Sequence, residues 1–249
     1  MNQIMVFKSN YPDIGFRSRS VTSGDEYALV EQFIDYYCSD FLRNNKKTQL
    51  AVFIEPGIDS GFPDVVFASF LPSIIDNWSD KREKLEIIDL KLLSYLADTK
   101  SVRGKTIISK LRFPEKEVLA SLERLMDAKL VSYCAGGWIV SKLRDVFSIT
   151  KLIAVEAKMN DISKVIDQSF VNTRFASQSY ALTNSTKPRN ETIQKFSSCG
   201  VGLYCKGTRF TKYVEAKQHT LPSSYLSYQF NEWIGKAITR KGDLQNAGF

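Results

Sequence analysis

A chain of 249 residues, of which 43% are hydrophobic and 24% charged, is long enough to bury one sizeable core, or one core and a smaller second one. No uncharged apolar run reaches the roughly 18 residues that a membrane span needs, and residues 1–20 lack the apolar centre of a signal peptide. We therefore expect a cytoplasmic protein with no membrane partner. Four cysteines without a C-x-x-C pair and a single histidine argue against a zinc site, and no G-x-S-x-G motif supports acyl transfer.

Charge is distributed unevenly along the chain. The net charge is +7, yet residues 1–85 hold nine Lys or Arg against twelve Asp or Glu, whereas residues 187–249 hold ten against four. Lys and Arg contacts to phosphates supply most of the sequence-independent affinity for nucleic acids. The basic C-terminal part therefore suits a polyanion, or else it is simply a solvated basic surface.

The first clear helix is predicted over residues 24–42. Apolar residues recur there at helical spacing and form one stripe, and Glu31 falls on that stripe. A carboxylate on an apolar stripe needs a cation, which either a metal ion or a Lys or Arg side chain could supply. Glu31 is therefore a candidate site residue, and Glu26 and Glu55 are weaker candidates.

Residues 49–70 are predicted to form a β-hairpin. The turn signals Pro56-Gly57 and Ser60-Gly61 separate two apolar runs of strand length. Pro63-Asp64 stands directly before the second run, so Asp64 opens the second strand.

Three helices and a second hairpin are predicted between residues 85 and 145. The helices cover residues 85–97, 104–111 and 114–128, and the hairpin pairs residues 130–133 with 138–140 around Gly136-Gly137. Residues 100–116 contain a basic cluster in which Glu115 is the only acid. The cluster consists of Lys100, Arg103, Lys105, Lys110, Arg112 and Lys116.

Residues 151–158, Lys-Leu-Ile-Ala-Val-Glu-Ala-Lys, form an apolar strand that ends in two opposite charges. Side chains alternate between the faces of a strand, so Glu156 and Lys158 share one face. Burying a charge is costly unless it is paired or holds a metal, so this ending predicts a divalent metal site, or else an exposed ion pair at a strand end. The same four letters, Val-Glu-Ala-Lys, recur at 214–217 after Thr-Lys-Tyr, where we expect a surface segment.

Alternating helices and strands are predicted after residue 158. A helix over 161–177 is followed by a strand over 178–183, a helix over 191–198 and a strand over 200–205. We expect residues 240–249 to form a loose tail.

Pro63-Asp64 followed by Glu156-Ala157-Lys158 resembles the motif of the PD-(D/E)xK nuclease superfamily. The resemblance implies a restriction-endonuclease-like α/β fold, a four-stranded mixed sheet flanked by helices. It also implies phosphodiester hydrolysis with Mg²⁺ as the cofactor, or Mn²⁺ as the alternative ion. Asp64, Glu156 and the carbonyl of Ala157 would hold the metal, and Lys158 would act on the attacking water. Glu31 matches a first-helix glutamate that often reaches the metal site in such families.

A glutamine on the helix after Glu-x-Lys is also frequent in relatives of this superfamily. Gln168 matches it, and Arg174 is the alternative contact to a phosphate. Each could equally be an ordinary residue of a polar helix face.

Three helices and a hairpin in this order resemble a winged helix-turn-helix, and residues 125–133 resemble its passage from the third helix into the wing. The family implies that the third helix enters a DNA major groove. Lys105, Lys110, Arg112 and Lys116 are then the candidate DNA contacts. Glu117 and Glu123 lie on the third helix, however, and winged helices also bind other proteins.

Together these patterns predict a nuclease-like core over 1–84 and 146–249 and a winged-helix insert over 85–145. The expected function is metal-dependent DNA cleavage. The alternatives are a DNA-binding regulator and a subunit of a defence complex, either of which would use the nuclease-like fold as a scaffold. Cleavage of both strands calls for two active sites, which a homodimer would supply.

Overall fold

The computed structural model describes residues 3–19 and 23–246, with side chains as far as Arg240. The chain folds as two compact units, each built from separate segments. The first comprises Met1–Phe70 and Ile149–Ser223, and the second comprises Leu71–Ser148 and Ser224–Phe249. Among the described helices, none combines the length and the apolar character that crossing a membrane requires.

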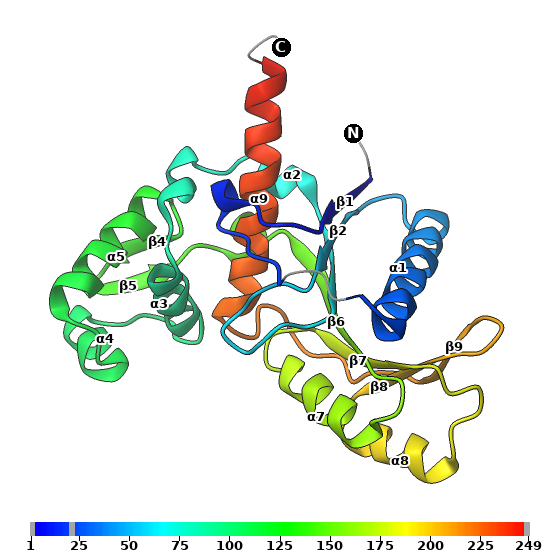
Figure 1. Cartoon of the computed structure of the whole chain (residues 1–249). Coiled ribbons are helices and arrows are strands. Elements are labelled where there is room, and N and C mark those ends of the chain that lie inside the picture. The colour runs from blue at the N-terminus through cyan, green and yellow to red at the C-terminus, as the bar shows by residue number, and fades with distance from the viewer. Residues whose placement is uncertain (1–2, 20–22, 247–249) are drawn as a thin grey trace. The chain divides into compact units, whose positions relative to one another are not determined.

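The first unit is a mixed seven-stranded sheet with helices on its faces, so the expectation of a helix-flanked mixed α/β sheet is confirmed (Figure 1). The strand order is β1-β2-β3-β6-β7-β8-β9. The strands are β1 (Ile4–Phe7), β2 (Gln49–Ile54), β3 (Val65–Phe70), β6 (Ile149–Ala157), β7 (Gln178–Thr183), β8 (Gly202–Lys206) and β9 (Phe210–Val214). The helices are η1 (Pro12–Ile14), α1 (Asp25–Asn44), α7 (Ile162–Asn172) and α8 (Asn190–Ser198).

Strand directions follow from the connections. The predicted hairpin is present, because β2 and β3 are antiparallel, and β6 pairs antiparallel with β3 on its other side. The units β6-α7-β7 and β7-α8-β8 are parallel crossovers, as the helix-strand alternation predicted. The sheet has three strands more than the resemblance implied. The outermost, β1 and β9, are short edge strands with exposed residues, and they lack the long apolar runs that identify central strands.

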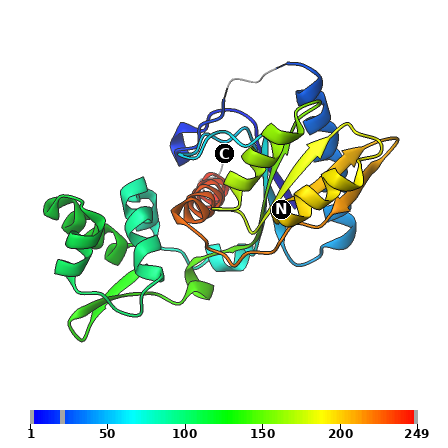
Figure 2. The same ribbon diagram turned by 90° about the horizontal axis from the view of Figure 1, so that it is seen from below.

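Side-chain alternation along the strands assigns each helix to a face. Val155 and Leu182 pack with Phe33 of α1, whereas Ala181, between Tyr180 and Leu182, packs with Val165 of α7 and Phe196 of α8. Helix α1 therefore covers one face of the sheet, and α7 and α8 cover the other (Figure 2). Strand β6 is buried from Leu152 to Ala157 because both faces and both edges of it are covered.

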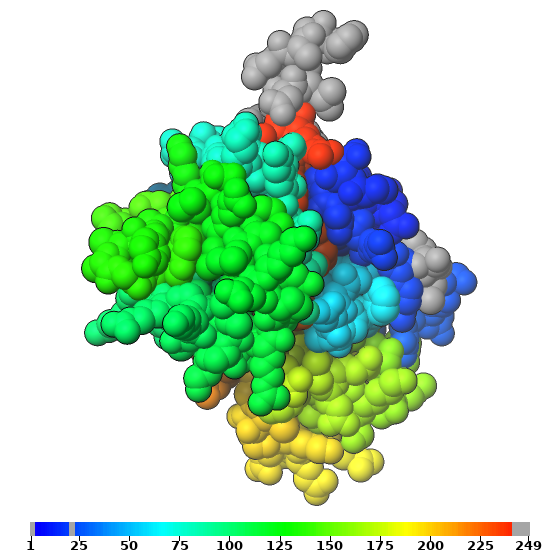
Figure 3. All heavy atoms as spheres, turned by 90° about the vertical axis from the view of Figure 1, so that its left-hand side faces the viewer, coloured from blue at the N-terminus to red at the C-terminus, as the bar shows by residue number. Residues whose placement is uncertain are grey.

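The second unit contains three helices and a hairpin in the predicted order, beside a long C-terminal helix. Its elements are α2 (Pro72–Ile75), η2 (Asp80–Lys84), α3 (Ile87–Ala97), α4 (Gly104–Leu111), α5 (Glu115–Asp127), β4 (Val131–Cys134), β5 (Gly137–Val140), α6 (Leu143–Val146) and α9 (Tyr225–Asn246). Leu92, Leu96, Ile107, Leu122 and Leu125 are buried between the elements of this unit. Figure 3 shows, in green, the surface that α4 and α5 help to form.

Helix α9 was not predicted, and it explains where the aromatic residues near the C-terminus belong. Phe230, Trp233 and Ile234 are buried, and Arg82 of η2 forms a buried ion pair with Glu232 while stacking on Trp78 at 3.3 Å. The expected loose tail from residue 240 is wrong as far as Asn246, because α9 continues to that residue. Residues 247–249 of that expectation lie outside the described part.

The unit boundaries differ from the predicted domain boundaries. The predicted insert, 85–145, lies entirely within the second unit. Residues 71–84 and 224–249, which the sequence analysis assigned to the nuclease-like core, also belong to the second unit, because η2 and α9 pack with each other and with α3.

Candidate active site at the edge of the sheet

Three strand ends meet at one edge of the sheet, and each carries a carboxylate. Strand β2 ends at Ile54, which pairs with Val65 at the start of β3, and Val65 also pairs with Val155 near the end of β6. One step beyond these pairs stand Glu55, Asp64 and Glu156. Cross-strand neighbours in an antiparallel pair have Cβ atoms about 4.5–5.5 Å apart. The register therefore places Asp64 beside both Glu55 and Glu156.

Asp64 is held by the backbone of the strand that it faces. Its Oδ2 accepts a hydrogen bond of 2.7 Å from the amide of Ala157. Burial raises the pKa of Asp64, and the charge of Glu55 adds to this, whereas the Ala157 amide, Lys158 and Arg19 oppose it. Burial is the largest of these effects, so the carboxylate is short of compensating positive charge.

Glu156 is the most perturbed carboxylate of the site. Its side chain is buried, with the residue 4% exposed, and its Oε1 accepts a hydrogen bond of 2.8 Å from Nδ2 of Asn172 at the end of α7. Burial raises the pKa of Glu156 to about 8, and the charge of Asp64 raises it further, while Asn172, Lys158 and Arg19 act in the opposite direction. Two neighbouring carboxylates with raised pKa values indicate a place that a cation would stabilise.

Lys158 reaches across to the first turn of α1. Its Nζ lies 2.6 Å from Oε2 of Glu26, and the amide of Met159 approaches Oε1 of the same carboxylate at 3.5 Å. The glutamate that α1 brings to the site is therefore Glu26. Glu31, the predicted one, is exposed and acts instead on Tyr27, whose pKa is raised by burial and by a hydrogen bond to Glu31. One and a half helical turns separate Glu26 from Glu31, which turns the two side chains in different directions.

Arg19 brings a second cation to the site. Its guanidinium contacts Glu55 at 2.7 and 3.4 Å, and its backbone amide bonds to the Glu55 carbonyl at 3.1 Å. The side chain of Glu55 is 6% exposed and that of Arg19 is 45% exposed. Glu55 adopts a left-handed backbone conformation with φ of 45°, which turns the chain out of β2 directly after the strand.

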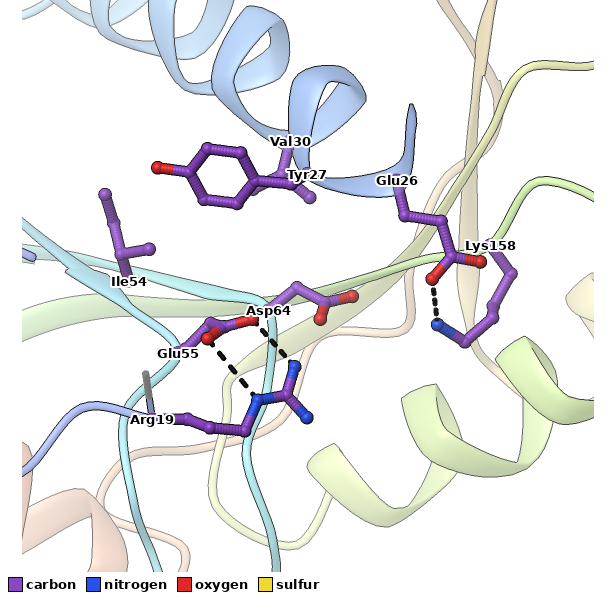
Figure 4. A pocket seen from close by; sticks show the side chains of 8 residues that line it. All are labelled: Arg19, Glu26, Tyr27, Val30, Ile54, Glu55, Asp64 and Lys158. Carbon is purple, nitrogen blue, oxygen red and sulfur yellow. Dashed lines mark hydrogen bonds and ion pairs between the residues drawn. The ribbon is translucent and has the colours of Figure 1, made fainter. Parts of the chain in front are cut away.

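A cavity of about 50 Å³, here called the carboxylate cavity, opens among these residues. Asp64 lies between the Arg19–Glu55 pair and the Glu26–Lys158 pair, as Figure 4 shows. One buried water needs roughly 10–15 Å³ on this measure, so the cavity has room for an ion with a few waters. Glu156 does not line the cavity and lies one register step from Asp64.

The donor set fits a hard divalent cation. Oδ1 of Asp64 and Oε2 of Glu156 have no hydrogen-bond partner among the described residues, and the carbonyl of Ala157 belongs to the same strand end. Carboxylate and carbonyl oxygens are the ligands that Mg²⁺ prefers. No set of three His, Cys, Asp or Glu side chains in the described part is arranged to hold a metal ion, so two carboxylates and a carbonyl are the set to consider.

The predicted residues of α7 are not those that reach the site. Gln168 is half-buried with its Oε1 unpartnered among the described residues, and Arg174 is exposed beyond the end of the helix. Asn172, one turn after Gln168, makes the contact to Glu156. Asn172 falls on the apolar stripe of Val165 and Ser169, so a buried polar residue on that stripe was the available signal. Arg19 carried no such signal, because it lies in an irregular segment.

The predicted DNA-contacting residues all lie in the second unit. Lys105 and Lys110 are exposed on α4, Lys116 is exposed on α5, and Arg112 is exposed between the two helices. Arg112 has a left-handed backbone with φ of 56° at the end of α4. No ion-pair partner is recorded for any of the four within the described residues.

A scan against protein-family models and searches among curated proteins and solved structures found no significant match to this chain.

Proposed function

We propose that the protein is a metal-dependent DNA endonuclease of the PD-(D/E)xK type. One observation supports this above all: Asp64, which opens β3, stands beside the end of β6, where Glu156, Ala157 and Lys158 follow one another. These positions are 93 residues apart in the chain at their hydrogen bond, so their meeting depends on the fold.

Asp64, Glu156 and the carbonyl of Ala157 are the residues that would hold Mg²⁺, with Mn²⁺ as the alternative ion. When bound, the ion polarises the scissile phosphate and acidifies a water. Asn172 orients Glu156, and the amide of Ala157 orients Asp64, so both carboxylates are held before a ligand arrives. Preorganised ligands lose little free energy on binding the ion.

Lys158 is the candidate catalytic cation. Its side chain is only 16% exposed, and its ammonium lies at the carboxylate cavity, opposite Glu26. There it orients the attacking water or stabilises the charge that develops on the phosphate. Glu26 is a positioning residue, because it holds the ammonium at this place in the absence of substrate.

The second unit is the proposed DNA-recognition module. Its order α3-α4-α5-β4-β5 agrees with a winged helix-turn-helix, and the basic cluster of residues 100–116 is exposed except for no member. The residues lie on the green part of the surface in Figure 3. Phosphate contacts from such a cluster would give affinity without sequence preference. Cleavage of both strands would call for a homodimer.

Incubation of the purified protein with supercoiled plasmid tests the proposal. We expect nicked and then linear plasmid with Mg²⁺, and none with EDTA. Asp64→Asn should remove the activity, whereas the exposed change Asp167→Asn on α7 should leave it unchanged. Equal cleavage by wild type and Asp64→Asn would exclude this site as the source of activity.

A DNA-binding regulator is the second candidate function, and one observation favours it. The charged groups of the Glu-x-Lys ending already have partners within the chain, Glu26 for Lys158 and Asn172 for Glu156. Such pairs would also suit a nuclease-like fold retained as a scaffold. DNA binding by the wild type without cleavage under any divalent ion would establish this alternative.

A further inference from the structure

A second and larger cavity opens at the carboxyl ends of β6 and β7. Its volume is about 470 Å³, within the roughly 300–1,000 Å³ range of small-molecule sites. Met159 and Asn160 line it directly after β6, and Asn184 and Ser185 line it directly after β7. Ligands of α/β sheets bind outside the carboxyl ends of parallel strands, which is where this cavity lies.

The lining of this cavity combines cations with an apolar floor. Lys187 and Arg189 contribute the charged groups, and no Asp or Glu lines it. Both side chains are exposed, and neither has an ion-pair or hydrogen-bond partner among the residues that the structure describes. Asp161, the nearest acid in sequence, is engaged as the cap of α7 through the amide of Lys164 at 2.9 Å.

Apolar side chains form the rest of the lining. Met159, Ile162 and Leu203 contribute carbon surface, and the amide of Asn184 and the hydroxyls of Ser185 and Thr192 contribute hydrogen-bonding groups. A ligand that satisfies all of these groups is anionic at one end and flat or apolar at the other. A nucleotide has this combination, because its phosphate is charged and its sugar and base offer carbon surface with polar edges.

We propose that this cavity binds a nucleotide, with the phosphate against Lys187 and Arg189 and the sugar and base over Met159, Ile162 and Leu203. The nucleotide is either part of a DNA strand or a free mononucleotide. In the first case the inference rests on the proposed function and extends it, because the cavity becomes a subsite for the strand that is cut.

Adjacent residues of one loop connect the two cavities. Lys158 lines the carboxylate cavity and Met159 lines the second one, and Glu26 contacts both through the Lys158 ammonium and the Met159 amide. A strand passing the metal site would therefore reach the second cavity without leaving this edge of the sheet. The loop between β6 and α7 is the segment that would sense both ligands.

The test compares two double variants of the full chain with equal change of charge. Lys187→Ala with Arg189→Ala removes the cations of the cavity, and Lys164→Ala with Lys195→Ala removes two exposed lysines of α7 and α8 that do not line it. Two probes are titrated in EDTA, which keeps the DNA intact. The first is thymidine 5′-monophosphate, with thymidine as the uncharged comparison, and the second is a fluorescein-labelled DNA duplex at several salt concentrations.

The variant of the cavity should bind at least one probe about tenfold more weakly than the control variant, because a hydrogen bond to a charged group is lost. Loss confined to the duplex, with a salt slope lower by about one to two, identifies a strand of DNA as the source. Loss confined to the mononucleotide identifies a free nucleotide. Equal binding of both probes by the two variants would overturn the inference.

The outcome is separable from that of the nuclease proposal. If the wild type never cleaves DNA but loses mononucleotide binding in the variant of the cavity, the nuclease proposal fails and this inference stands. If the wild type cleaves plasmid and neither probe distinguishes the variants, the nuclease proposal stands and this inference fails.

Discussion

The carboxylate of Asp64 accepts a hydrogen bond of 2.7 Å from the backbone amide of Ala157, across 93 positions of the chain. The antiparallel register of β3 and β6 produces this contact, because it sets the start of one strand against the end of the other. The contact fixes the direction of Asp64 while leaving its Oδ1 available to a ligand.

Replacing Asp64 with Asn should remove metal binding and preserve the fold. The Asn amide oxygen can still accept the hydrogen bond from Ala157, but the site loses one of its two charged ligands. Isothermal titration of Mn²⁺ should show binding to the wild type and a loss of at least about tenfold in affinity in Asp64→Asn. Asp167→Asn, an exposed change on α7, is the control. Unchanged affinity in Asp64→Asn would place the metal elsewhere.

The metal-free protein should lose stability as the pH rises, through Glu156. The pKa of Glu156 is raised from 4.5 to about 8 in the folded protein, chiefly by burial. Between these values the folded state keeps a proton that the unfolded chain has released, so the free energy of unfolding falls as the pH increases. The fall is at most roughly 1.4 kcal/mol for each pH unit of this window. Below pH 4.5 the effect is absent, and above about pH 8 it is complete.

Glu156→Gln should remove this dependence, because an amide cannot ionise and can still accept the hydrogen bond from Asn172. Urea unfolding in EDTA should find the variant and the wild type equally stable near pH 5 and the variant more stable at pH 9. Glu191→Gln, an exposed change on α8, should follow the wild type at every pH. A wild type whose stability does not decline relative to Glu156→Gln would mean that Glu156 is ionised at neutral pH.

Removing two cations of the basic cluster should weaken DNA binding and reduce its salt dependence. Arg112→Asn suits the left-handed backbone at φ 56°, since Asn tolerates that conformation, and Lys116→Ala is on exposed helix surface. Each lost phosphate contact lowers the slope of log affinity against log salt by about one. Lys46→Ala with Lys47→Ala, exposed after α1, is the charge-matched control. Identical slopes for the two double variants would assign the second unit to protein interaction instead.

Most elements could be predicted from the sequence because each carries a local signal. Helix α4 and strand β7 have the predicted bounds, and the two hairpins appear where the turn residues indicated. The edge strands β1 and β9 escaped prediction because they are short and partly exposed. Helix α9 was missed because buried polar residues such as Asn231 and Glu232 interrupt its apolar pattern, and their partners come from distant segments.

The candidate site could be predicted only in part. Asp64 and Lys158 were found because they stand at the ends of apolar strands, where a charge needs a reason. The choice between Glu26 and Glu31 depended on how α1 sits on the sheet, which the spacing of its apolar stripe does not determine. The second Val-Glu-Ala-Lys segment shows the same limit, because Glu215 bonds to Tyr180 and Gln178 while Val214 and Ala216 are buried.

The repeated tetrapeptide supplies the most direct measurement. Lys158→Ala and Lys217→Ala remove the same side chain from the same four-residue sequence, but only Lys158 lies at the carboxylate cavity. Initial rates of plasmid cleavage in Mg²⁺ should fall by at least about a hundredfold in Lys158→Ala, as expected when a group that stabilises the transition state is lost, and should stay at the wild-type level in Lys217→Ala. Full-rate cleavage by Lys158→Ala, or equal losses in both variants, would contradict the assignment of the chemistry to this site.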